Sequence, residues 1–286
     1  MGKTFFGALL ALLLVTTASN ATPFSVVTTL PSDPSAAANW YSGSALATSG
    51  TVIAVGAPGG DTSDGATTGT GKGYVSLFNC PPAGSATTCV YASDVTGPAS
   101  GSLFGASIVL LNNGTFLAVG APGYSSSAGY VQFYSLATVT SPASITSFAP
   151  NYASAQLGFA MAGTMSGSTL WVFAGAPYYE ETSGAGDCTF SSPCGTVAMY
   201  VCTVSGTTYS CPAQTSYAFN DAYNTGYAVA AAVVSSGVVG LATVDPGGKY
   251  IMYTFRCTAT ACGSATTPSP TASYSFGKLF IYLFIY

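Results

Sequence analysis

Short apolar runs that stop at Gly-Ala-Pro recur along the chain and dominate its predicted secondary structure. Three of them read TVIAVGAPGG (51–60), TFLAVGAPGY (115–124) and LWVFAGAPYY (170–179), and a less regular one reads VVGLATVDPGG (238–248). Each run is a continuous series of small and β-branched residues, which is typical of a strand buried on both faces. Because proline has no N–H to donate to a sheet, we expect each strand to end at its proline.

Further strands flank each run and complete a recurring unit. A segment such as LFGASIVLLNNG (103–114) or LGFAMAGTMSG (157–167) precedes the run, and one such as GYVSLF (73–78) or GYVQFY (129–134) follows it. A fourth, less regular strand closes the unit. This order predicts an all-β fold, a β-propeller of four-stranded antiparallel blades. We expect about four blades plus a partial fifth that begins at SFGKL (275–279), and therefore an incomplete or truncated propeller.

The pairing of Phe104-Gly105 with Gly120-Ala121-Pro122, spread over the other units as well, resembles the FG-GAP repeat of integrin α-chain β-propellers. The resemblance covers roughly residues 40–277 and is strongest in the second unit. It implies a propeller of the integrin type that serves extracellular recognition or cell adhesion and engages its ligand at one rim.

Integrin-type repeats often bind calcium in the turn between the first and second strands of a blade. The corresponding turns here, 47–51, 111–115, 164–169 and 234–238, contain no acidic residue. Calcium needs six or more oxygen ligands, several of them carboxylates. We therefore carry no calcium site over and expect no metal and no cofactor.

Most of the acidic residues lie instead in loops that follow Gly-Ala-Pro. In an up-and-down blade, these loops share one rim of the propeller with the links between blades, so acids and neighbouring tyrosines would gather there. Exposed loops on a rigid scaffold are a common place for recognition. An acidic loop that serves only solubility is the alternative. The candidate binding residues are Asp61, Asp64, Tyr124, Tyr178, Tyr179, Glu180, Glu181 and Asp187.

The eight cysteines fall into four sequence-local pairs: Cys80 with Cys89, Cys188 with Cys194, Cys202 with Cys211, and Cys257 with Cys262. None has the Cys-x-x-Cys spacing of a zinc site, so we predict four disulfides. Three of the pairs bracket the turn between the third and fourth strands of their unit. The remaining pair closes the longest loop of the third unit.

The N-terminus predicts export. Lys3 precedes an apolar stretch, 5–15, that has the length of a signal-peptide core and is too short to cross a membrane. We expect a signal peptide at 1–21, an N-terminal segment at 22–39, the propeller repeats at 40–277, and an apolar tail at 278–286. That tail reads either as a strand that closes a blade or as the mark of a truncated gene model.

Three further features narrow the function. Asn113-Gly114-Thr115 is an N-glycosylation sequon, as expected for a secreted or cell-surface protein. The chain has no histidine, which removes the usual general base. It has five Lys and Arg in total, too few for a nucleic-acid surface.

Our leading hypothesis is a non-enzymatic recognition or adhesion module for an extracellular protein or glycan ligand. Two alternatives stay open. One is a secreted carbohydrate-active enzyme with paired carboxylates such as Asp61 and Glu180. The other is a structural protein of the cell surface or wall.

Overall fold

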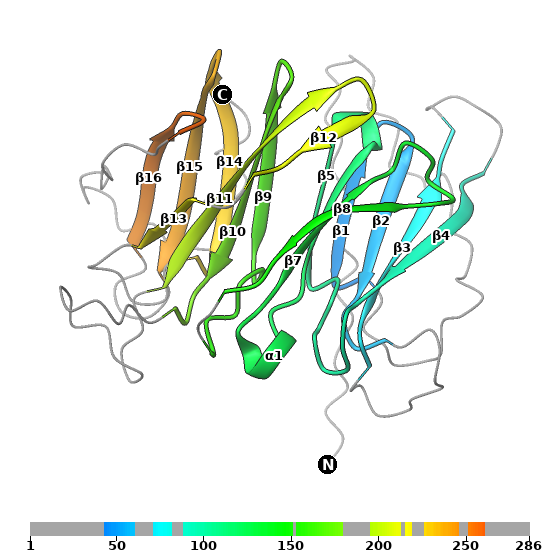
Figure 1. Ribbon diagram of the computed structural model, residues 1–286, viewed down its shortest axis with the longest axis horizontal. Coiled ribbons are helices and arrows are strands. Elements are labelled where there is room, and N and C mark those ends of the chain that lie inside the picture. Colours follow the sequence, from blue (N-terminus) through cyan, green and yellow to red (C-terminus); the bar gives the residue numbers. More distant parts are fainter. Residues whose placement is uncertain are drawn as a thin grey trace, which may run out of the picture.

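The structure, a computed structural model, describes residues 43–60, 71–81, 88–150, 153–179, 195–212, 215–218, 226–245 and 251–260. These ranges hold sixteen strands in four antiparallel sheets, with helical structure confined to one 3-10 turn (Asn112–Gly114) and one short helix, α1 (Tyr124–Ser127). The predicted all-β, blade-like architecture is therefore confirmed (Figure 1). The expected signal peptide, N-terminal segment, start of a fifth unit and apolar tail lie outside the described residues.

The four sheets follow one another along the chain. The first contains β1 (Ala45–Ser49), β2 (Val52–Ala57), β3 (Tyr74–Asn79) and β4 (Val90–Thr96). The second contains β5 (Ser107–Leu111), β6 (Phe116–Gly120), β7 (Val131–Ser135) and β8 (Ala143–Phe148). The third contains β9 (Met161–Ser166), β10 (Thr169–Ala176), β11 (Thr196–Ser205), β12 (Thr208–Ser210) and β13 (Thr215–Ala218). The fourth contains β14 (Ala228–Ser235), β15 (Val238–Asp245) and β16 (Ile251–Cys257).

Each described sheet is a meander in which consecutive strands pair antiparallel. In the third sheet, β12 and β13 both pair with β11, so together they form one interrupted fourth strand. The strands of the Gly-Ala-Pro runs end where the prolines predict: β2 and β10 stop directly before Pro58 and Pro177.

The outer strand of the first two sheets carries an irregularity at the same place. The register between β3 and β4 shifts by one residue between Leu77 and Phe78, and that between β7 and β8 shifts between Phe133 and Tyr134. These are equivalent positions of GYVSLF and GYVQFY. The break between β12 and β13 lies at the corresponding part of the third sheet. Such bulges twist an edge strand and make it a poorer template for pairing with another chain.

The hydrophobic core lies between consecutive sheets, as β6 illustrates. All five of its residues are buried. Phe116 and Ala118 belong to the apolar cluster shared with the third sheet, whereas Leu117 and Val119 belong to the cluster shared with the first. Successive side chains of a strand point to opposite faces. The uninterrupted apolar run of the sequence therefore serves two cores at once.

The sheets form an open series. Their first strands, β1, β5, β9 and β14, lie next to one another in that order, and the extensive contacts between described elements fall within a sheet or between consecutive sheets. The first and fourth sheets lie at opposite ends of the molecule (Figure 1). The described part of the chain is thus a propeller-like array in which the last sheet does not meet the first.

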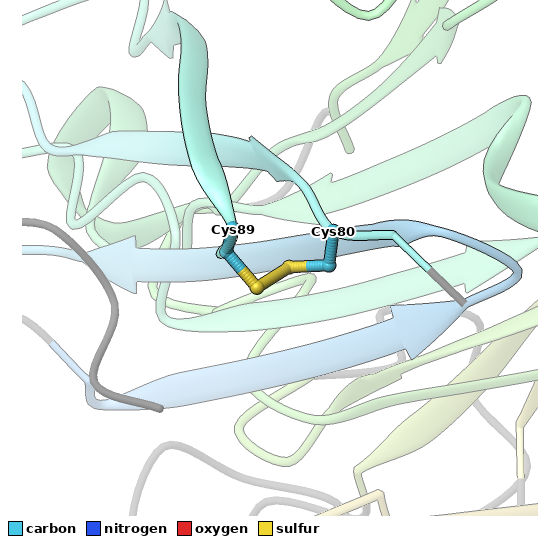
Figure 2. The surroundings of a disulfide bond; sticks show 2 residues. All are labelled: Cys80 and Cys89. Atoms are coloured by element: carbon cyan, nitrogen blue, oxygen red, sulfur yellow. A yellow bond between two sulfur atoms is a disulfide. The ribbon is translucent and has the colours of Figure 1, made fainter. Parts of the chain in front are cut away.

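Two disulfides brace turns between third and fourth strands. Cys80–Cys89 joins the end of β3 to the start of β4 (Figure 2), and Cys202–Cys211 crosses the β11–β12 hairpin. Both join the pairs that the sequence predicts. Cys257 is disulfide-bonded as well. The cysteine expected to pair with it, Cys262, lies outside the described residues, as do Cys188 and Cys194.

Candidate functional site

Consecutive sheets meet through a contact between two glycines, which we call the glycine seam. One glycine comes from the Gly-Ala-Pro end of a second strand, and the other from the turn that begins the next sheet. A Cβ built on the first glycine would lie very close to the carbonyl oxygen of the second: 2.1 Å for Gly56 and Gly105, 2.3 Å for Gly120 and Gly158, and 1.9 Å for Gly175 and Gly226. No side chain fits in such a gap, so the seam requires glycine.

The second glycine of each seam has a left-handed backbone, with φ of +91° at Gly105, +85° at Gly158 and +96° at Gly226. This conformation disfavours residues with a side chain. The N–H of Gly105 donates to the carbonyl of Gly120 (3.0 Å), closing the first two strands of its own sheet. The N–H of Gly158 does the same with Gly175 (3.0 Å). The turn therefore both closes its own sheet and docks on the preceding one.

The residue before each seam glycine anchors the turn. Phe104 is fully buried and Leu157 is 2% exposed. Each also forms an isolated parallel bridge to the preceding sheet, Phe104 with Gly73 and Leu157 with Gly129. The Phe-Gly motif of one sheet thus touches the Gly-Ala-Pro motif of the preceding sheet, in addition to its hydrogen bond to the Gly-Ala-Pro motif of its own sheet.

Loops between second and third strands share one rim with the links between sheets. The N–H of Gly123 donates to Ser102 (3.0 Å), that of Gln156 to Ser127 (2.8 Å), and that of Tyr178 to Ala155 (3.4 Å), in each case to the backbone carbonyl. We call this surface the loop rim; its described residues are 58–60, 71–73, 97–106, 121–130, 153–159, 177–179 and 226–227. Helix α1 marks it at the lower edge of Figure 1.

The three predicted tyrosines all lie on the loop rim but not in one cluster. Tyr124, in α1, packs against Tyr130 with ring centroids 4.9 Å apart, and both rings lie against the core between the first and second sheets. Tyr179 packs against the core between the second and third sheets. Tyr178 is half-buried. The three tyrosines are therefore spread along the rim, and Tyr124 and Tyr179 are anchored in different cores between the sheets.

The five predicted acids, Asp61, Asp64, Glu180, Glu181 and Asp187, lie outside the described residues. The chain on either side of them is described. The N–H of Gly73 donates to the carbonyl of Gly60 (2.7 Å), and that of Gly195 to Tyr179 (3.3 Å). The described residues that flank the two acid-bearing segments are therefore joined to each other by hydrogen bonds, at Gly60 and Tyr179 of the loop rim.

Strained backbone is concentrated on the loop rim. Eight non-glycine residues of the described chain have positive φ. Six of them lie on this rim, with φ between 50° and 63°: Leu103, Ser125, Ser126, Ser127, Ser154 and Gln156. A left-handed residue with a side chain costs about 1–2 kcal/mol, and such residues cluster at functional sites. Leu103 and Gln156 occupy equivalent places, directly before Phe104 and Leu157.

An aromatic pair that sequence reasoning missed joins the third and fourth sheets. The rings of Phe159 and Tyr227 lie 4.7 Å apart, and Tyr227 is 43% exposed. Each directly follows a seam glycine, Gly158 or Gly226. An aromatic residue after the recurring glycine, in LGF and TGY, was the available signal.

The opposite rim carries the turns between first and second strands. In the second sheet this is the turn Asn112–Gly114, where Asn113 is exposed. The amide of Asn112 donates to the hydroxyl of Tyr209 (2.8 Å), which also bonds Oγ1 of Thr115 (2.7 Å). Tyr209 lies in β12, so this hydrogen-bonded group ties the second sheet to the third. Glycosylation of Asn113 stays a prediction.

The described loop rim is nearly free of charge. Lys72 is its single residue with a charged side chain. Nowhere in the described chain do three His, Cys, Asp or Glu side chains come together as metal ligands would, and no described helix has the length and apolarity to span a membrane. What the rim offers is hydroxyls, peptide groups and aromatic rings, a set suited to binding.

Comparison with known proteins gives no relative from which a site could be transferred: no family model matches the chain, and a search of curated proteins finds no match.

Proposed function

We propose that the chain is an extracellular, non-enzymatic recognition or adhesion module built on FG-GAP-like propeller repeats, and that its loop rim binds the ligand. The observation that carries this proposal is the concentration of left-handed, side-chain-bearing residues on that rim. Strain of this kind persists where the surrounding structure holds it and where function uses it. The buried sheets beneath supply the rigid support.

The glycine seam supports the FG-GAP part of the proposal. It gives a physical reason why Phe104-Gly105 and the Gly-Ala-Pro motif at Gly56 occur in one sequence, because the two meet across a sheet boundary. The disulfides Cys80–Cys89 and Cys202–Cys211 support an extracellular or otherwise oxidising location.

The scarcity of charge on the described rim favours a ligand bound through aromatic stacking and hydrogen bonds. An extracellular protein surface or a glycan meets that requirement, since tyrosine offers both a ring face and a hydroxyl.

The test compares rim variants with a control on the opposite rim. Tyr178→Ser and Tyr227→Ser remove rings from the loop rim, while Val90→Ser changes a residue that is 55% exposed beside Cys89. Purified secreted protein is applied to a glycan array and to cells. We expect the wild type and Val90→Ser to bind alike and both tyrosine variants to bind more weakly. Equal binding by all four proteins would refute the loop rim as the binding surface, and glycoside hydrolysis by the wild type would favour the enzyme alternative.

A further inference from the structure

Phe159 and Tyr227 occupy equivalent places in the third and fourth sheets. Each directly follows a left-handed glycine and lies just before the first strand of its sheet. The residues at this place in the first two sheets are Ser44 and Ala106. Because the first strands β1, β5, β9 and β14 lie next to one another in that order, these four residues form a row at the start of the strands. Small side chains make up one half of the row and aromatic rings the other.

The two rings are in contact and rest on a fixed backbone. Their planes are inclined by 42°, and Tyr227 is exposed while Phe159 is half-buried. The N–H of Phe159 donates to the carbonyl of Gly175 (3.2 Å). The N–H of Gly226, directly before Tyr227, donates to Oγ1 of the buried Thr243 (2.9 Å). A surface that is positioned before its ligand arrives loses less conformational entropy on binding.

The chemistry of this pair fits a neutral sugar ring. One face of a pyranose carries C–H groups that pack on an aromatic face, and its edge carries hydroxyls that bond to a phenol or to peptide groups. The row contains no charged side chain. Two aromatic side chains bury about 300–500 Å² together, which falls short of the roughly 800 Å² that each partner of a stable protein complex contributes. The pair is therefore better suited to a sugar than to a protein surface.

We propose that Phe159 and Tyr227 form a stacking platform for a neutral sugar ring, and hence that the ligand of the loop rim is a glycan. This assignment rests on the proposed function and names the class of its ligand. Tyr227 supplies the exposed ring face and a hydroxyl, and Phe159 supports that ring from the third sheet. Ser44 and Ala106 have no bulky side chain that would obstruct a sugar chain lying along the row.

The first measurement uses the purified full chain and short neutral oligosaccharides of glucose, galactose, mannose and N-acetylglucosamine as probes. Proton NMR of a bound saccharide should show C–H signals shifted upfield, because the ring current of an aromatic face shields protons that stack on it. This measurement needs no variant, so it tests the platform even where a substitution prevents folding. Binding without any upfield shift would overturn the proposal.

The second measurement compares variants by isothermal titration calorimetry with the same saccharides. Tyr227→Leu and Phe159→Leu should each weaken binding about tenfold, because each removes an aromatic face. Tyr227→Phe keeps the ring and should weaken binding only a few-fold. Tyr91→Leu is the matched control, since it removes a tyrosine from another aromatic pair, with Phe78 in the first sheet, and should leave binding unchanged.

Two results would overturn the platform while leaving the proposed function in place. One is saccharide binding that Tyr227→Leu and Phe159→Leu leave unchanged, which would put the sugar elsewhere. The other is a wild-type protein that binds cells through the loop rim but binds none of the saccharides, which would make the ligand a protein surface. Failure of the proposed function itself has a different signature, namely equal cell binding by the wild type and every rim variant.

Discussion

The carbonyl oxygen of Gly158 lies 2.3 Å from the position that a Cβ would occupy on Gly120. Gly120 and Gly158 are nearly forty residues apart in sequence, and at this point the backbones of the second and third sheets are in direct contact. The hydroxyl of Ser107 donates to the same carbonyl (2.6 Å) and occupies the remaining space. Neither glycine can move away easily, because pairing of β6 with its neighbouring strands holds Gly120, and a hydrogen bond to Gly175 holds Gly158 where it closes the third sheet.

We therefore expect Gly120→Ala to lower the free energy of unfolding by about 2–3 kcal/mol, as overpacking at a rigid site does. Urea denaturation, monitored by circular dichroism, measures this loss of unfolding free energy. Gly240→Ala is the matched control, since a Cβ there first meets the end of the Val234 side chain at 2.9 Å, which can move. Similar losses in the two variants would argue against the seam as a special contact.

Removal of the Cys80–Cys89 disulfide should cost about 2–3 kcal/mol, because it frees a short loop in the unfolded chain. The double variant Cys80→Ser/Cys89→Ser, measured against wild type by chemical denaturation, gives the value. An unchanged midpoint would mean that the native hairpin holds the turn without the bond.

The remaining cysteines should also pair locally, Cys188 with Cys194 and Cys257 with Cys262. Mass mapping of a non-reduced digest tests this. A link from Cys89 to Cys188, or free thiols in the purified protein, would contradict both the pairing and the alignment of the units.

Alkaline pH should destabilise the fold through Tyr200. Burial raises the pKa of Tyr200 above its ordinary value of 10. The folded state therefore retains the proton when the unfolded state has lost it. The resulting contribution is complete below pH 10 and decreases as the pH rises above it, by about 1.4 kcal/mol per pH unit for one group.

Tyr200→Phe should make this alkaline slope shallower, because phenylalanine does not titrate. Tyr134, whose pKa is raised by burial and then by its neighbour Tyr130, keeps part of the slope. Denaturation at pH 8 to 11 measures both proteins. Identical slopes would show that Tyr200 reaches solvent in the folded state.

Calcium should leave the melting temperature unchanged. The turns between first and second strands offer no carboxylate; the second is Asn112–Gly114, and the first and third contain Gly50 and Gly167. Differential scanning fluorimetry tests this by measuring the melting temperature with millimolar calcium and again after a chelator is added. A reversible rise of several degrees would assign a calcium site to the acid-bearing loops.

Local chemistry explains what the sequence could predict. The end of β2 before Pro58 and of β10 before Pro177 follow from the missing N–H of proline, and the continuous burial of β6 follows from its unbroken apolar run. Cys80 and Cys89 could be paired by spacing alone. Each of these inferences needs only residues close together in the chain.

What the sequence did not reveal arises between sheets. Leu103 and Gln156 have ordinary side chains and no intrinsic preference for positive φ, so their residue types do not predict their left-handed backbone. Phe159 and Tyr227 lie far apart in sequence and meet only because two seams are adjacent. Among the predicted site residues, the tyrosines reached one rim, but the cores between the sheets anchor two of them in separate places.

Small-angle X-ray scattering of the purified chain tests the open, propeller-like array most directly. The structure predicts an open array in which the first and fourth sheets lie at opposite ends, as they do in Figure 1. The pair-distance distribution should then be skewed, with a tail to long distances. A symmetric distribution from a compact, monodisperse monomer with a closed-ring profile would contradict the account.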